Sequence, residues 1–203
     1  YVQTRGLDAL HVTVAHEFFH GVQFSYYSGR NGLWWQEASA TWMEEVAYPE
    51  VDDYLQYVPS VLRRPERALA SGNFTVETRI YGSAIFAHFL DQRFGRDLIR
   101  SIWEEMGTSN HARLVNFERA IRQRIPGGLP EAIGEYAVWN YFTGVNHRAG
   151  MFYAEGEKYG EVRTHTLQTV SKVAVVDSGQ VDHTGSTYVR LEPQLQSGGV
   201  VLE

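Results

Sequence analysis

The sequence predicts an α+β protein in which a predominantly helical region is followed by a small β-rich module. Apolar residues recur at helical spacing through most of the first 158 residues, and Gly and Pro mark the ends of these segments. Short runs of β-branched residues separated by Gly, Ser and Pro begin only after that point. We therefore divide the chain into a helical region, 1–158, and the start of a β-rich module, 159–203.

The composition limits the classes of function. With 203 residues and 43% hydrophobic content, the chain can bury one substantial core. A net charge of -6 without a basic stripe argues against nucleic-acid binding, and no apolar run approaches the length of a membrane span. Cysteine is absent, so no redox compartment is indicated. Since the chain starts at Tyr1 without a signal peptide and stops at Glu203 in a strand-like run, we expect a fragment of a longer protein.

The first expected helix carries the motif His16-Glu17-Phe18-Phe19-His20. In a helix His16 and His20 lie about 40° apart on one face, whereas Glu17 points about 100° away. Two imidazoles with a neighbouring carboxylate are the residue types of a zinc site with a general base. A shuffled chain of this composition would contain the motif roughly 0.03 times, so chance is a poor explanation. The alternative is a pair of hydrogen-bonded core histidines with Glu17 as their acceptor.

The residues around this motif predict that its helix is buried. Apolar side chains occur on all sides of it, as in a helix enclosed by a core. These residues are Leu10, Val12, Val14, Ala15, Phe18, Phe19, Val22 and Phe24.

A catalytic zinc site needs a third protein ligand. A third His six residues after His20 would complete one known pattern, but that position is Tyr26, and Gln23 stands where the pattern needs Gly. The alternative is Glu37, on a second expected helix at 34–48 that follows a Gly- and Asn-containing turn. Glu37 could instead be a solvated surface residue, although the tryptophans around it argue against a fully exposed face.

The surroundings of Glu37 support its role as the third ligand. Small residues at 38–40 would allow the two helices to approach closely. Glu44, about 10.5 Å further along the same face, is too distant to ligate the same ion. Thr41 lies one turn after Glu37 and could orient it, whereas Asp52 and Asp53 lie beyond Pro49 and are expected to cap the next helix.

The rest of the chain predicts further helices and then short strands. Helical spacing with Pro, Gly or cap residues at the ends indicates helices at 51–61, 81–93, 98–106, 109–125 and 131–143. The strand-like runs are 173–176, 187–191 and 199–202.

These motifs resemble a known superfamily. The motif at 16–20, followed by Trp34-x-x-Glu37-Ala-x-Ala, is similar to the gluzincin metallopeptidases, which include thermolysin-like and alanyl aminopeptidase-like enzymes. More narrowly, the run at 13–24 with Thr41-Trp-Met-Glu-Glu and Asp52-Asp-Tyr resembles a group of bacterial secreted metalloproteases. The resemblance covers roughly residues 8–155 and implies a zincin-like catalytic region with Zn²⁺ bound by His16, His20 and Glu37. It also implies secretion.

The resemblance further implies how catalysis would proceed. Zinc would activate a water molecule, with Glu17 as general base and then general acid. Gluzincins often carry a Tyr or His on a later helix as oxyanion donor, which points to Tyr81 and, more weakly, to His88 seven residues on. A buried core Tyr and ordinary helix packing are the respective alternatives. Such enzymes also pack the motif helix against an upstream sheet, which is either missing from this chain or assembled differently.

The predicted function is a zinc-dependent peptidase acting on peptide or protein substrates. An endopeptidase is favoured over an aminopeptidase because the Gly-x-Met-Glu-Asn signature that grips a free amino terminus is absent from the chain. The alternatives are a catalytically inactive metallopeptidase-like binding or adhesion module, and a metal hydrolase that acts on other bonds.

Overall fold

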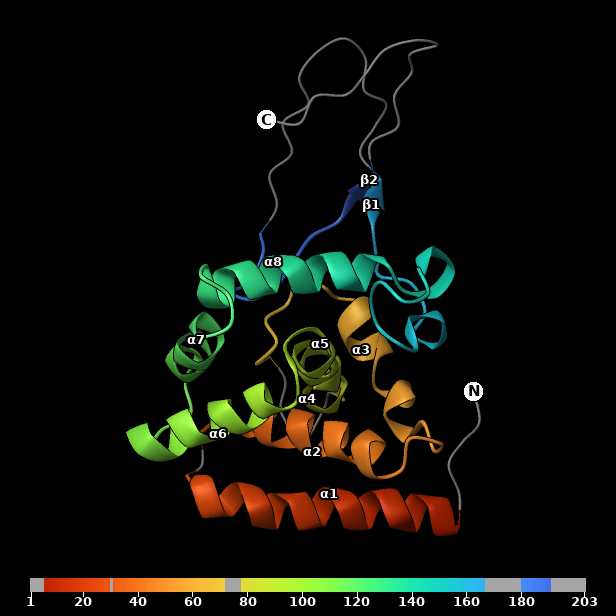
Figure 1. Cartoon of the computed structure of the whole chain (residues 1–203). Helices are drawn as coiled ribbons and strands as arrows, with labels where there is room; N and C mark the ends of the chain where they lie inside the picture. The colour runs from red at the N-terminus through yellow and green to blue at the C-terminus, as the bar shows by residue number, and fades with distance from the viewer. Residues whose placement is uncertain (1–5, 30, 72–77, 167–179, 191–203) are drawn as a thin grey trace, which may run out of the picture.

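A computed structural model describes residues 6–29, 31–71, 78–166 and 180–190, and these residues are predominantly helical (Figure 1). The α-helices of the first half are α1 (Leu7–Tyr26), α2 (Leu33–Ala47), α3 (Pro59–Leu62), α4 (Arg79–Gly82) and α5 (Ala84–Phe94). They are followed by α6 (Asp97–Ser109), α7 (Leu114–Arg122) and α8 (Gly128–Tyr141). Three short 3-10 helices lie at Asp53–Gln56, Gly144–Asn146 and Gly156–Lys158. The predicted helical region is confirmed.

The helices α1 and α2 form an antiparallel pair at one side of the molecule (Figure 1). Their close approach depends on small residues, since Ala38, Ser39 and Ala40 of α2 are completely buried. Gly32 begins the turn into α2 with a left-handed φ of 84°, a conformation that favours glycine. The predicted return of a second helix past the first is therefore confirmed.

The prediction that α1 is buried on all sides is wrong. Its inner face contacts α2 and α6, and there Val12, His16 and Gln23 are buried. Its outer face carries apolar side chains that the described residues leave exposed, among them Val14 at 55% and Phe18 at 75%. The helix is apolar around its circumference, but the described elements reach only one side of it (Figure 1).

The other side of α2 packs on an aromatic core centred on α5. Trp35 of α2 meets Phe117 of α7 edge to face, with ring centroids 5.0 Å apart. Phe86 and Phe89 of α5 are buried against Tyr136 and Trp139 of α8. Edge-to-face aromatic pairs of this kind add stability beyond their buried area. They hold α2 in a fixed position, and α2 carries Glu37.

Two of the predicted helices are divided. The segment 51–61 forms a 3-10 helix and then α3, whose first residue is Pro59, a position that its missing N–H allows. The segment 81–93 is broken at Ser83, whose hydroxyl oxygen lies within hydrogen-bond distance of the carbonyl oxygens of Arg79 and Leu69. Tyr81 therefore lies on the short helix α4, before the break, and not at the start of α5.

Two helix starts also differ from the predictions. Helix α7 begins at Leu114 rather than near Ser109, because Asn110 adopts a left-handed φ of 51° and ends α6. Helix α6, predicted at 98–106, already includes Asp97 in its first turn, after the N-cap residue Arg96. Asp52 provides no side-chain cap; its carboxylate instead pairs with Lys158.

The predicted β-rich module is not shown by the described residues. They contain two two-residue strands, β1 (His165–Thr166) and β2 (Val189–Arg190), paired in parallel with His165 opposite Val189. The predicted strands at 173–176 and 199–202 lie outside the described residues. The β1–β2 pair lies beyond α8, on the opposite side of the molecule from α1 (Figure 1).

The contact between α3 and α4 leads to a stability prediction. A Cβ at Gly82 would collide with the Tyr57 carbonyl and the Ser60 hydroxyl, whereas a Cβ at Gly21 on α1 would meet no described atom within 4 Å. We expect Gly82→Ala to lower the free energy of unfolding by about 1–3 kcal/mol through overpacking. Gly21→Ala should raise it by up to about 1 kcal/mol through helix propensity. Urea denaturation measures both changes, and equal stability of the two variants would contradict the packing described.

Candidate metal centre

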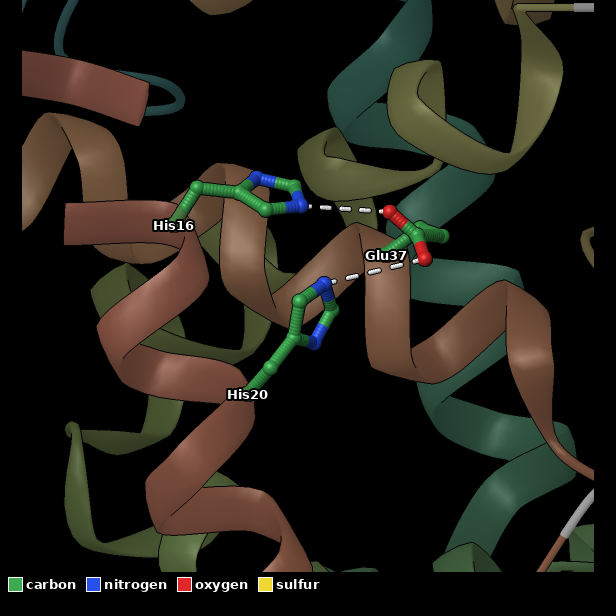
Figure 2. A group of neighbouring side chains, drawn as sticks. All are labelled: His16, His20 and Glu37. Carbon is green, nitrogen blue, oxygen red and sulfur yellow. Dashed lines mark hydrogen bonds and ion pairs between the residues drawn. The ribbon is translucent and has the colours of Figure 1, made fainter. Parts of the chain in front are cut away.

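Three side chains from α1 and α2 converge on one point. His16 and His20 lie one turn apart on the inner face of α1, and Glu37 faces them from α2 (Figure 2). His16 Nε2 is 3.2 Å from one carboxylate oxygen of Glu37, and His20 Nε2 is 3.7 Å from the other. Glu37 is 6% exposed, which excludes the alternative that it is a solvated surface residue. The structure thus brings together the three residues predicted as ligands.

The spacing of these donors fits a zinc ion. Two donors about 2.1 Å from zinc at a tetrahedral angle lie about 3.4 Å apart. The two His–Glu separations, 3.2 and 3.7 Å, lie on either side of this value. One ligand atom from each of the three residues also lies within 4.8 Å of the others. Two imidazoles and one carboxylate are a donor set that zinc accepts while keeping a fourth position open.

The second nitrogen of each imidazole has a partner that sequence reasoning did not find. His16 Nδ1 lies 2.6 Å from Glu44 Oε1, and His20 Nδ1 lies 2.8 Å from Gln23 Oε1. Both Nε2 atoms are left facing Glu37. Histidines that bind metals usually donate their other N–H to such an acceptor. The available signals were positional, because Glu44 lies seven residues after Glu37 on the same helical face and Gln23 lies three residues after His20.

The predicted role of Thr41 is wrong. Thr41 is buried, and its hydroxyl has no hydrogen-bond partner among the described residues. Glu37 instead faces the two histidines.

The electrostatics of the centre favour positive charge. Glu37 and Glu44 are both buried, and among the described residues only histidines pair with them. Burial alone would lower the pKa of His16, but hydrogen bonds and charge interactions with Glu37 and Glu44 outweigh it and raise that pKa to about 9. Burial also raises the pKa of Glu44, against the effect of His16. A proton on His16 or a divalent cation can supply the charge that these carboxylates require.

Glu17 lies outside the donor group. It is exposed on α1, and no hydrogen bond within the described residues joins it to His16 or His20. The alternative in which Glu17 is the acceptor for two core histidines is therefore wrong. The predicted general base is thus exposed to solvent on the motif helix.

Tyr81 lies beside the centre. Its ring centroid is 6.2 Å from that of His16 and 5.2 Å from that of Tyr57, which sequence analysis did not single out. Burial raises the pKa of Tyr81, and the charges of Glu37, Glu17 and Glu44 raise it further. The hydroxyl therefore remains protonated at neutral pH and can donate a hydrogen bond.

His88, the weaker candidate, is part of the core. Its ring lies 4.6 Å from that of Tyr54, and burial lowers its pKa to about 3. Ser83 separates its helix, α5, from the short helix of Tyr81, and the two side chains have different neighbours, His16 for Tyr81 and Tyr54 for His88.

A second acidic group lies away from the centre. Carboxylates of Glu45, Asp52 and Glu155 approach one another closely enough to hold an ion. The ammonium of Lys158, however, already lies 2.9 Å from Asp52 and 2.5 Å from Glu155. Lys158 therefore already supplies positive charge to this acidic group.

Comparison with known proteins identifies the family but no activity. The model of a "Family of unknown function (DUF6055)" matches residues 1–199. The chain belongs to this family. No curated protein and no solved structure matches the chain. Within the described ranges, none of the helices of this DUF6055 member joins sufficient length to sufficient hydrophobicity for a bilayer span.

The buried His88 leads to a prediction of pH-dependent stability. The pKa of His88 is about 3 in the folded protein and near 6.5 when unfolded, so the unfolded chain binds the additional proton below pH 6.5. The stabilising contribution of neutral His88 is complete above pH 6.5 and falls as the pH drops toward 3. Between pH 6.5 and 5 we expect a loss of about 2 kcal/mol that His88→Leu does not show. Urea denaturation at the two pH values tests this, and parallel losses in both proteins would contradict it.

Proposed function

We propose that this protein is a zinc-dependent peptidase in which His16, His20 and Glu37 hold the metal. The observation that supports this is the convergence of three donors whose separations suit zinc, each histidine having a partner for its second nitrogen. Bound zinc would supply a Lewis acid that polarises the substrate carbonyl and stabilises the developing negative charge. The buried carboxylates Glu37 and Glu44 provide the negative surroundings in which a divalent cation is stable.

Glu17 is the proposed general base. Because it is exposed and makes no described hydrogen bond to the histidines, its carboxylate is free to meet a water molecule at the centre. It takes a proton from this water as the oxygen forms a bond to the carbonyl carbon. It then delivers the proton to the amine nitrogen as the carbon–nitrogen bond breaks. Atoms and charge balance within water and peptide, and Glu17 is regenerated as a carboxylate.

Tyr81 is the proposed hydrogen-bond donor to the oxyanion. Its ring lies beside His16, and its raised pKa keeps the phenol protonated during turnover. A neutral donor that faces developing negative charge stabilises the transition state more than the ground state.

An endopeptidase remains the favoured form of this proposal. A free amino terminus would need a carboxylate to bind it, and the carboxylates that act on Tyr81 and His16, namely Glu17, Glu37 and Glu44, are already assigned to catalysis, to metal binding or to the orientation of His16. An unfolded protein is therefore the appropriate first substrate, because it offers internal peptide bonds of every kind.

The role of Glu17 is tested by Glu17→Gln. Parent and variant should each bind about one zinc per chain, since Glu17 is not a ligand, while the variant should lose about 10²–10⁴-fold in cleavage rate. Metal analysis after dialysis and hydrolysis of casein measure the two properties. If the parent binds zinc without cleaving any substrate, the alternative of a non-catalytic binding module is favoured; if it binds no zinc, the proposal fails.

The role of Tyr81 is tested by Tyr81→Phe. Loss of one oxyanion donor should lower kcat by about 10²–10³-fold and leave KM and zinc content nearly unchanged. Tyr48→Phe is a matched control, because the Tyr48 ring stacks on His11 of the same helix α1 and belongs to no part of the proposed site. Equal kcat values for the two variants would assign Tyr81 to packing alone.

A further inference from the structure

We propose that Gln23 is a positioning residue that fixes the tautomer and the orientation of His20, so that Nε2 presents its lone pair to the metal. This inference rests on the proposed zinc site and adds to it a residue outside the ligand motif. Gln23 is 1% exposed, so its amide must satisfy its hydrogen bonds within the protein.

The contacts of Gln23 determine which way its amide faces. Gln23 Nε2 lies 2.9 Å from the Gln36 carbonyl oxygen and 3.1 Å from Ser39 Oγ. The carbonyl can only accept. The Ser39 hydroxyl has one hydrogen, which it donates to the Trp35 carbonyl at 2.7 Å, so toward Gln23 it too accepts. The group that faces both oxygens must therefore be the NH₂, and the carbonyl oxygen Oε1 must face His20.

This orientation decides where His20 carries its proton. Gln23 Oε1 lies 2.8 Å from His20 Nδ1 and can only accept a hydrogen bond. His20 Nδ1 is thus the protonated nitrogen. In the neutral ring Nε2 is then left with a lone pair, and this is the nitrogen that faces Glu37 (Figure 2). A neutral imidazole in this tautomer is the form that binds zinc.

The same contacts place His20 relative to Glu37. The Gln36 carbonyl that anchors Gln23 belongs to the residue immediately before Glu37 on α2. One buried amide therefore connects a ligand on α1 to the turn of α2 that carries the other ligand. A shift of either helix would strain this connection, so the distance between the two donors is maintained by Gln23 as well as by packing.

The two histidines have acceptors of different charge. His16 has the carboxylate of Glu44, whereas His20 has the neutral amide of Gln23. A third carboxylate beside the buried pair Glu37 and Glu44 would increase the repulsion among them. A neutral acceptor orients the ring without that cost.

The experiment compares Gln23→Met with Gln23→Glu in the full chain. Both variants leave the Gln36 carbonyl without its donor and should lose similar stability, but only Glu retains an acceptor for His20 Nδ1. Zinc affinity is measured by competition with a chromophoric chelator, and the geometry of the site by the visible spectrum of bound Co²⁺. Urea denaturation checks that each variant folds. Ser39→Ala serves as a control that removes one anchor of the amide and keeps the acceptor.

We expect Gln23→Met to weaken zinc binding about 10–100-fold and to change the Co²⁺ spectrum. Gln23→Glu and Ser39→Ala should bind zinc more tightly than Gln23→Met and give spectra close to that of the parent. The positioning role of Gln23 is overturned if Gln23→Met binds zinc as tightly as the parent, or if Gln23→Glu binds zinc as weakly as Gln23→Met. Either result leaves the proposed zinc site itself intact. A parent chain that binds no zinc overturns the proposed function itself.

Discussion

The burial of Glu37 and Glu44 on one face of α2 is the constraint on which the rest of the centre depends. A carboxylate removed from water loses several kcal/mol of solvation unless a positive charge or hydrogen-bond donors replace it. Helix α1 meets this requirement with His16, which contacts both carboxylates. The same arrangement that makes the two helices compatible in the absence of metal makes the space between them suitable for a divalent cation.

The close packing of α1 on α2 follows from small side chains, and the position of α2 follows from the core behind it. Ala38, Ser39 and Ala40 are small and completely buried, while Trp35 packs on Phe117 of α7 and Trp42 lies against Phe19 of α1. Dense packing leaves α2 little freedom to shift. Helix α1 has less support, because its outer face meets none of the described elements. Buried hydrogen bonds such as those of Gln23 therefore contribute more to its placement.

Much of the helical architecture was predictable from the spacing of apolar residues and from the Gly, Pro and cap residues at the helix ends. The second helix of the centre, predicted at 34–48, lies within one residue of both predicted ends, and the predicted end at 93 lies one residue before the end of α5. The boundaries that were missed depend on contacts beyond the local sequence. Ser83 breaks a continuous apolar pattern because its hydroxyl reaches the carbonyl of Leu69, and Asn110 ends α6 by taking a left-handed conformation. The exposure of α1 was missed because apolar residues on all sides of a helix show which faces can be buried, but not which other elements pack against them.

For the candidate centre, the sequence by itself determined which side chains share a helical face. The 3.6-residue repeat places His16 beside His20, and it places Glu44 on the face of Glu37, whatever the rest of the chain does. Only the tertiary structure decided that these two faces meet, that Glu44 and Gln23 accept from the imidazoles, and that Tyr81 lies beside His16 while His88 lies in the core. The physical reason is that periodicity fixes angles around one helix axis. Distances between side chains on different helices are set by the close packing of the whole core.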